Sequence, residues 1–373
     1  MPHRPKILEA ISEGVGGGAK HVYDLVCHMQ GEFSFSVVCP DNGPYFDKFK
    51  ALGVPVVEVP FTAFSPGSFF QLRRLLQRDD IELVHVHGRK AGLYGRLACL
   101  CADVPVVYSF HGLHHQKHGA FLRTLSIGVE RALGRRTDRF INVSSSEHQA
   151  CLALGLLDPE RSLVACNGID WQSFDALTVD VRQVKTGLGF DPGDVVVGQI
   201  AKFDVQKAQD DLAAAIPLVL EKCPSAKFLF VGDGALRPQI EAQVVRLGVD
   251  RQVVFTGYRD DVPVLLKAID VIALPSRWEG LSLVLLEAMA CRKPIVASRV
   301  TGNIDVVVDG VTGFLVPSGA PQVLAEKIVL LLQDARLCDE LGRRGRERVE
   351  QEFSLARMVA HMRSVYQDLL DRP

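Results

Sequence analysis

The stretch Pro275-Ser276-Arg277-Trp278-Glu279-Gly280 joins an apolar run, Asp270 to Pro275, to a second apolar run that continues from Gly280 through Glu287. The first run is typical of a buried strand and the second of a helix. Between a strand and a helix start, an α/β domain offers unpaired N–H groups and partial positive charge to a phosphate. Glu279 and Glu287 can each reach a hydroxyl beside that phosphate. The stretch therefore predicts a nucleotide-sugar site, since that ligand has one diphosphate and two polyhydroxylated rings.

The same alternation of short apolar and longer amphipathic runs extends over the rest of the chain. It predicts strands at 6–11, 34–39, 54–59, 83–87, 106–110, 139–143 and 162–166, then a polar stretch from Trp171 to Gly193. Strands at 195–200, 227–231, 253–255, 270–274, 294–297 and 313–316 follow, separated by helices. Such alternation favours βαβ units and parallel sheets. We predict an α/β fold with two doubly wound, Rossmann-like domains.

Size and composition are those of a cytoplasmic globular protein. The 373 residues suggest two domains, and a net charge of −2 gives no signature of a nucleic-acid binder. Nine scattered cysteines without a C-x-x-C pair indicate a reducing compartment. No uncharged apolar run is long enough to span a membrane. We predict a cytoplasmic location, with contact to the cytoplasmic membrane face as an option.

The glycine-rich segment from Gly14 to Ala19 follows a strand and opens a helix that we expect from His21. Glycines let the backbone approach a phosphate closely. With Asp41 after the second strand, Gly14-x-Gly16-x-x-Ala19 also fits a dinucleotide fingerprint. An NAD(P)-dependent oxidoreductase is therefore the main alternative, and this segment alone does not choose.

Two lysines follow the strand at 195–200. Lys202 and Lys207 lie on one loop and can turn toward one site, where they would neutralise a leaving diphosphate. The chemistry of an NAD(P)-dependent oxidoreductase does not require these lysines, nor Glu279 and Glu287, so these residues favour the nucleotide-sugar site.

These motifs together resemble those of retaining GT-B glycosyltransferases of family 4. Glu279 and Glu287 match the family's E-x7-E motif, and Lys207 matches its basic loop, although Lys202 stands where arginine is usual and Ala208 where glycine is usual. Gly16 and Gly17 followed by His21, and His111-Gly112 after a strand, match first-domain patterns. The resemblance covers roughly residues 6–370.

The resemblance implies a domain arrangement and a set of roles. It implies an N-terminal acceptor-side domain (1–172) and a nucleotide-sugar domain (173–353) facing each other across a cleft, with a helix (354–373) returning to the first domain. His111, Lys207 and Glu279 would act at the reacting centre. Donor binding would fall to Gly16, Gly17, Lys202, Lys207, Gly232, Gly257, Tyr258, Glu279, Gly280, Leu281, Ser282, Leu283 and Glu287. His21, His87 and Arg89 would lie on the acceptor side.

The function implied is transfer of a sugar, with retention, from an NDP-sugar to an acceptor hydroxyl. UDP is favoured as the nucleotide, hexose or N-acetylhexosamine as the sugar, and the NDP-sugar is a substrate, so no cofactor is expected. The basic segment Lys117 to Arg139 suggests a lipid-linked acceptor or an anionic membrane surface. Gly302-Asn303-x-Asp305 looks like the variant in enzymes that build bacterial surface polysaccharides. A non-catalytic GT-B partner subunit is a further alternative.

The sequence offers only minor candidates for a metal-binding site. His111 with His114, His115 and His118, and His85 with His87 on one strand face, could suggest metal ligands. No Asp-x-Asp motif stands at a strand end, and lysines with a helix dipole can neutralise the phosphates. We therefore predict metal-independent transfer.

Overall fold

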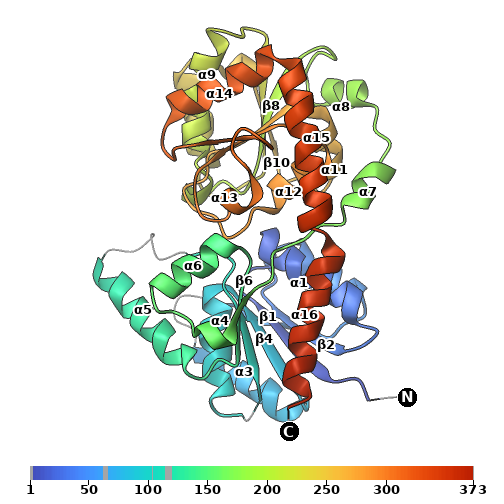
Figure 1. The fold of residues 1–373 in the computed structure, drawn as a ribbon, viewed down its shortest axis with the longest axis vertical. Helices are drawn as coiled ribbons and strands as arrows, with labels where there is room; N and C mark the ends of the chain where they lie inside the picture. The colour runs from blue at the N-terminus through green and yellow to red at the C-terminus, as the bar shows by residue number, and fades with distance from the viewer. Residues whose placement is uncertain (1–2, 62–65, 103, 114–119, 373) are drawn as a thin grey trace. The chain divides into compact units, whose positions relative to one another are not determined.

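The computed structural model describes residues 3–61, 66–102, 104–113 and 120–372 (Figure 1). His114, His115, Lys117 and His118 lie outside the described residues. Contacts divide the chain into one unit of residues 1–167 with 355–373 and a second unit of residues 168–354. The divisions fall at Asn167/Gly168 and Ser354/Leu355, whereas the family resemblance implies them after 172 and after 353.

The first unit is built on a seven-stranded parallel sheet in the order β3-β2-β1-β4-β5-β6-β7. The order reverses between β1 and β4, which is the topological switch point of a doubly wound sheet. The strands are β1 (Lys6–Ile11), β2 (Ser34–Cys39), β3 (Val56–Glu58), β4 (Leu83–His87), β5 (Val106–Ser109), β6 (Arg139–Asn142) and β7 (Ser162–Val164).

Helices cover both faces of this sheet because its strands bury side chains on both sides. Ile7 and Ile11 of β1 point into a core with α1 (Gly16–Met29), while Leu8 and Ala10 point into the opposite core. In α4 (Gly88–Cys99) a Cβ on Gly95 would lie 2.4 Å from the Val86 side chain, so glycine sets how closely this helix approaches the sheet. The remaining helices before residue 168 are α2 (Pro44–Ala51), α3 (Pro66–Arg78), α5 (Ala120–Gly134) and α6 (Ser145–Ala153).

The C-terminal helix α16 (Leu355–Leu370) belongs to the first unit, as predicted from the family resemblance. Its apolar stripe, which includes Met358, Met362 and Tyr366, packs into the same core as α1 and β1. Arg363 forms an ion pair with Glu32 at the end of that core. The first domain is therefore completed by residues from the far end of the chain.

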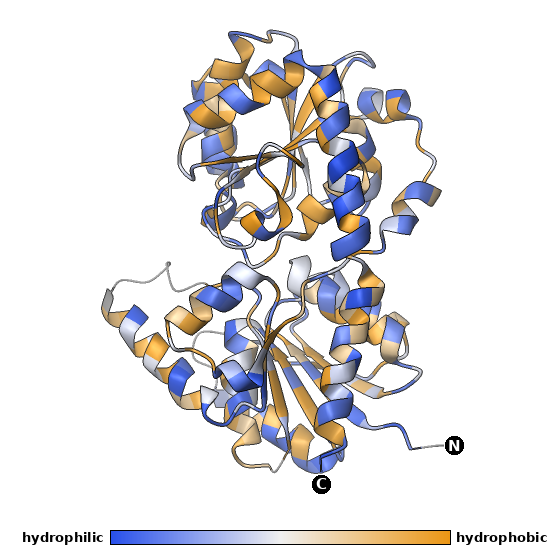
Figure 2. Ribbon diagram, in the orientation of Figure 1, coloured by the Kyte–Doolittle hydropathy of each residue, from blue (hydrophilic) through white to orange (hydrophobic). Residues whose placement is uncertain are grey.

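The second unit repeats the architecture with a six-stranded parallel sheet in the order β10-β9-β8-β11-β12-β13. The strands are β8 (Val195–Ile200), β9 (Ala226–Val231), β10 (Val253–Gly257), β11 (Val271–Leu274), β12 (Ile295–Ser298) and β13 (Phe314–Val316). The helices are α7 (Trp171–Ala176), α8 (Val181–Gly187), α9 (Gln209–Leu220), α10 (Arg237–Arg246), α11 (Val262–Ala268), α12 (Leu283–Ala290), α13 (Asn303–Val306), α14 (Pro321–Gln333) and α15 (Ala335–Glu352). The two predicted Rossmann-like sheets are thus confirmed. In Figure 2 the strands are predominantly hydrophobic, whereas α15 is largely hydrophilic.

One local prediction was wrong, and two short helices were not predicted. Helix α1 begins at Gly16, not at His21, so Gly16 and Gly17 lie in its first turn rather than in a loop before it. Glycine has poor helix propensity, which hid this start from the sequence. The polar stretch Trp171–Gly193 contains α7 and α8, each capped by an aspartate side chain, Asp170 and Asp180. Within the described residues, no helix is both long and apolar enough to span a membrane.

Candidate active site

Lys207 and Glu279 form an ion pair at the carboxyl ends of two neighbouring strands of the second unit. Nζ of Lys207 donates to Oε1 of Glu279 at 2.6 Å, and the Glu279 side chain is only 5% exposed. Lys207 ends the short helix η3 (Val205–Lys207) after β8, and Glu279 follows β11. Because β8 and β11 pair in parallel, their following loops meet at one edge of the sheet.

Further hydrogen bonds fasten these two loops to each other. Gln206 donates through Nε2 to the carbonyl of Trp278 at 3.0 Å, and its own carbonyl accepts from the Arg277 amide at 2.7 Å. Arg277 donates to the Val205 carbonyl at 2.7 Å. Ala208 adopts a left-handed conformation, φ +49°. That conformation gives a physical reason for the family's glycine here, since a Cβ makes it costly.

Helix α12 (Leu283–Ala290) follows Glu279 closely in the sequence. It contains Glu287, and the three amides predicted to bind phosphate, those of Leu281, Ser282 and Leu283, lie at its start. Ser282 is its N-cap residue but makes no side-chain cap, and Leu283 is its first residue. Leu281 and Ser282 are buried, while Glu287 is half-buried one turn into the helix. A helix start without a side-chain cap suits an anion bound by backbone N–H groups.

Gly280 is held by the loop that follows β12. A Cβ on Gly302 would lie 2.4 Å from the Gly280 carbonyl oxygen, so only glycine permits this approach. The next residue, Asn303, is fully buried and donates through Nδ2 to the Ser298 carbonyl at 3.0 Å. Asn303 of the Gly-Asn-x-Asp variant therefore has a structural role in this loop.

The other predicted donor residues of this unit also follow strands of the same sheet. Gly232 donates its amide to the Gly257 carbonyl at 2.9 Å, and a Cβ on Gly232 would lie 2.1 Å from the Ala201 carbonyl oxygen. Tyr258 is half exposed and its hydroxyl donates to Asp260 at 2.8 Å. Lys202 is exposed on the β8 loop. All of them lie at the carboxyl edge of the sheet, the edge where open α/β sheets bind ligands.

In the first unit, the predicted residues also gather after strands β1, β4 and β5. Gly16 and Gly17 are exposed in the first turn of α1, whose N-cap Val15 has no side-chain cap. Arg89 is half-buried in the first turn of α4.

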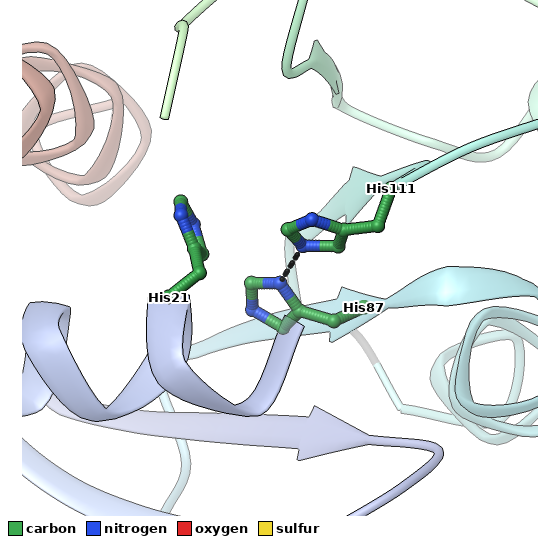
Figure 3. Close-up of side chains that lie close together, drawn as sticks. All are labelled: His21, His87 and His111. Carbon is green, nitrogen blue, oxygen red and sulfur yellow. Dashed lines mark hydrogen bonds between the residues drawn. The ribbon is translucent and has the colours of Figure 1, made fainter. Parts of the chain in front are cut away.

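His21, His87 and His111 come together in this unit, as Figure 3 shows. Nδ1 of His87 and Nε2 of His111 are 2.9 Å apart and hydrogen-bonded. The His21 ring meets the His111 ring edge-on, with centroids 4.9 Å apart. Neither ring nitrogen of His21 has a hydrogen-bond partner among the described residues, although the side chain is buried.

Behind the histidines lies a buried carboxylate that the sequence analysis missed. Oε2 of Glu9 accepts from Nε2 of His87 at 2.7 Å, and Oε1 accepts from the Tyr366 hydroxyl at 2.7 Å. Tyr366 in turn contacts Nδ1 of His85 at 2.6 Å, and Nε2 of His85 contacts Ser109 at 2.8 Å. A charged residue in the apolar run Lys6–Ile11 was the available signal, because buried carboxylates need partners.

Burial and these contacts set the protonation of the cluster. Burial alone would raise the pKa of Glu9, but the charges of and hydrogen bonds from His85 and His87 outweigh it, so the pKa is lowered. Burial, with the nearby charge of His85, lowers the pKa of His87 to about 4. Burial likewise lowers the pKa of His21 well below its usual value. At neutral pH, Glu9 is therefore a carboxylate, and His87 and His21 are neutral imidazoles.

The described residues contain two groups whose atoms could hold a metal ion. One consists of His21, His87 and His111, whose ligand atoms all lie within 4.8 Å of one another, and the other of Glu9, His85 and His87. Three imidazoles are a ligand set that zinc uses.

Comparison with known proteins identifies the family. A model described as "Glycosyltransferase Family 4" matches residues 15–172, and one described as "Glycosyl transferases group 1" matches residues 194–334. The alpha-maltose-1-phosphate synthase of Mycolicibacterium smegmatis is 31% identical, over 95% of this chain and 96% of the relative. An Escherichia coli enzyme, UDP-Gal:alpha-D-GlcNAc-diphosphoundecaprenol alpha-1,3-galactosyltransferase, is 26% identical over 97% and 96%.

A solved structure agrees on the fold. HepE of Anabaena, in complex with UDP and glucose, superposes with a TM-score of 0.87 at 24% identity, covering 98% of this chain and 100% of HepE. The chain is an α/β protein of the GT-B fold and belongs to glycosyltransferase family 4. It is therefore a glycosyltransferase and not the dinucleotide-dependent oxidoreductase considered from the glycine segment.

Proposed function

We propose that this protein transfers a hexose or N-acetylhexosamine from a UDP-sugar to an acceptor hydroxyl, with retention at the anomeric carbon. The observation that carries the proposal is the Lys207–Glu279 pair, 2.6 Å apart at the carboxyl edge of the second sheet. An ammonium at this edge can meet the β-phosphate, while the carboxylate beside it can bind a sugar hydroxyl. UDP in the HepE complex and UDP-Gal in the name of the Escherichia coli relative support the choice of nucleotide.

The second unit supplies a role for each part of the donor. Lys207, with Lys202 on the same loop, balances the charge that develops on the diphosphate as its bond to the sugar breaks. The amides of Leu281, Ser282 and Leu283 hold the diphosphate at the start of α12. Glu279 binds hydroxyls of the sugar and places its anomeric carbon, and Glu287 binds the ribose hydroxyls. The roles of Gly16, Gly17 and His111, which belong to the first unit, stay predictions.

Lysines and a helix start can neutralise the diphosphate together, and the transfer is proposed to need no metal ion. The leaving phosphate oxygen would accept the proton of the incoming hydroxyl on the same face of the sugar.

A donor panel with a coupled nucleotide-release readout tests the proposal. We expect release from one UDP-sugar to exceed release from GDP- and ADP-sugars. Glu279→Ala should lower kcat at least 100-fold while leaving the melting temperature within a few degrees, and the anomeric proton of the product should report retention by NMR. UDP should raise the melting temperature, because a site ligand stabilises by mass action, and NAD should not. No release from any nucleotide sugar, with or without added divalent ions, would contradict the proposal.

The acceptor is proposed to be a lipid-linked saccharide at an anionic membrane surface, because α5 presents apolar side chains to solvent. Phe121 is 80% exposed, and Leu122 and Leu125 are more than half exposed. Leu125 lies three residues after Leu122 and four after Phe121, which places the three side chains on one stripe of the helix. Arg123, Arg135 and Arg136 are exposed on or just after the same helix. An apolar stripe with neighbouring arginines suits the interface of an anionic bilayer.

Two further features tie this surface to the predicted acceptor side. A hollow between α4 and α5 is lined by Leu93, Leu125 and Val129, with Arg89 in its wall. Arg96 of α4 forms a buried ion pair with Glu130 of α5 at 2.5 Å, which fixes α5 against α4. Apolar walls beside an arginine fit a lipid chain that carries a diphosphate, and the Escherichia coli relative is named for a diphosphoundecaprenol acceptor.

Cosedimentation with vesicles tests the membrane contact. We expect binding to phosphatidylglycerol vesicles and little binding to phosphatidylcholine vesicles, weakening with salt. Leu125→Glu should abolish it. Leu330→Glu, a control at an exposed leucine of α14 in the other unit, should not. Equal loss in both variants, or binding that ignores lipid charge, would contradict the assignment of α5.

A further inference from the structure

The buried chain from Glu9 through His87 to His111 fixes which nitrogen of each ring carries the proton. Glu9 is a carboxylate and can only accept, so Nε2 of His87, 2.7 Å away, must donate to it. His87 is neutral and has one ring proton, and its Nδ1 must therefore be an acceptor. The hydrogen bond at 2.9 Å between Nδ1 of His87 and Nε2 of His111 then requires a proton on Nε2 of His111.

A second branch holds the carboxylate itself in place. The Tyr366 hydroxyl donates to Oε1 of Glu9, so its oxygen accepts from Nδ1 of His85. Both carboxylate oxygens are thus engaged, and the Glu9 side chain is fully buried. Because both oxygens accept hydrogen bonds and are buried from water, the Glu9 carboxylate keeps its orientation and continues to accept from His87.

We propose that Glu9 and His87 are positioning residues that hold His111 as the neutral Nε2–H tautomer, so that its Nδ1 presents a lone pair to a substrate hydroxyl. The proposal rests on the proposed function only in taking that hydroxyl to belong to the sugar substrate. His111 has a left-handed backbone, φ +55°, which a residue other than glycine adopts at a cost. The strained backbone and the buried hydrogen-bonded chain both fix the orientation of the His111 ring.

The hydrogen bond between the two rings and a metal ion bound by both of them exclude each other. Two nitrogens bound to one tetrahedral zinc, each about 2.0–2.1 Å from it, lie about 3.3 Å apart. The observed 2.9 Å is the length of a hydrogen bond and leaves no lone pair on Nε2 of His111 for an ion. The hydrogen-bonded chain also uses both nitrogens of His87, which a shared ion would disrupt.

Histidine-selective 15N NMR on the full chain measures the tautomer without any assay of activity. We expect His111 to show an Nε2–H pattern at pH 7.5, with Nδ1 unprotonated. Glu9→Gln, nearly isosteric, offers an amide that can donate to His87. We expect it to reverse both rings, so that His111 becomes Nδ1–H, a donor where the wild type is an acceptor. Transfer by Glu9→Gln should fall at least 30-fold in kcat, with the affinity for UDP unchanged, since Lys207, Glu287 and the amides at the start of α12 belong to the other unit.

Ser162→Ala is the control. It removes a hydroxyl that lies 2.9 Å from Nε2 of His148, in the same unit but outside the chain from Glu9 to His111, and should leave the His111 tautomer unchanged and kcat within about threefold. An Nδ1–H or doubly protonated His111 in the wild type would overturn the proposal, as would Glu9→Gln with the wild-type tautomer and rate. Should Glu9→Gln not fold, the wild-type spectrum still decides. A further experiment adds Co²⁺ to the wild type and to His21→Ala. If the wild type shows d–d absorption bands and His21→Ala does not, the three histidines bind a metal ion, which would overturn the proposed hydrogen-bonded chain. Absence of transfer with every donor would contradict the proposed function while leaving the tautomer measurement valid.

Discussion

Lys207 and Glu279 depend on each other for stability as well as for the proposed chemistry. Lys207→Met leaves a carboxylate that is 5% exposed and whose remaining hydrogen bond among the described residues comes from Gln206, at 3.4 Å. Removing one partner of a buried pair costs several kcal/mol, and because Lys207 is 21% exposed we expect about 2 kcal/mol. The double variant Lys207→Met with Glu279→Leu should recover to within about 1 kcal/mol of the wild type, since no unpaired charge remains. Urea unfolding measures both. Neither variant should transfer sugar, and stability losses that simply add would show that the pair is not coupled.

The buried histidine cluster should make stability depend on pH below neutrality. The pKa of His87 is about 4 in the folded chain against 6.5 for an ordinary histidine. Between these values the unfolded chain binds a proton that the folded chain refuses, so the free energy of unfolding falls as pH drops from 6.5 toward 4. The gap corresponds to roughly 3 kcal/mol at about 1.4 kcal/mol per unit. The lowered pKa of Glu9 acts in the same direction below pH 4.5.

Urea unfolding between pH 6.5 and 4 tests this dependence. The free energy of unfolding should fall less steeply in His87→Gln than in the wild type, and as steeply as in the wild type in His3→Gln, a control at an exposed histidine. A flat wild-type profile would contradict the assignment of a neutral His87.

At the scale of elements, the sequence predicted what local pattern controls and missed what distant contacts control. The two sheets follow from alternating apolar runs. The family resemblance placed Lys207 and Glu279 at one reacting centre, but their ion pair was not predicted. Helix α1 starts at glycines, which contradicts local propensity. Helices α7 and α8 lie within a polar stretch and begin at aspartate caps, a local signal that was overlooked. The contact of Glu9 with Tyr366 joins residues at opposite ends of the chain, and no local pattern encodes it.

The loop after β12 should control the geometry of the E-x7-E segment through a single contact. Gly302→Ala places a Cβ 2.4 Å from the Gly280 carbonyl oxygen, at φ +81°. Gly310→Ala is a matched control, with φ +72° and nothing within 4 Å of its Cβ. Both should lose about 1 kcal/mol from backbone strain. Only Gly302→Ala should lose more and raise the KM for the donor at least tenfold, because Gly280 and the start of α12 must move. Urea unfolding measures the loss of stability, and kinetics measure the KM for the donor. Equal KM values in the two variants would show that the contact between Gly302 and Gly280 does not set the geometry of the donor site.

At the scale of the whole molecule, the chain makes two units but not two consecutive ones. The second unit is a continuous segment with its own core, whereas the first needs α16 from the C-terminus. Tyr366 of that helix both fills the first core and donates to Glu9, so the last residues support the fold and the proposed positioning chain together.

A chain ending at Ser354 should therefore lose the first unit and keep the second. It lacks seven buried apolar residues of α16: Leu355, Met358, Val359, Met362, Val365, Tyr366 and Leu369. At about 1.5–3 kcal/mol for each buried side chain, their loss costs about 10–20 kcal/mol, which matches or exceeds the roughly 5–15 kcal/mol that stabilises a typical domain. Limited trypsin digestion should degrade residues before 168 and leave a protected fragment close to 168–354, which mass spectrometry can identify. A chain ending at Leu370 keeps all of α16, loses the exposed Asp371 and Arg372 with the last residue, and should resist trypsin like the full chain. Equal protection of both units after removal of α16 would mean that the first core is complete without this helix.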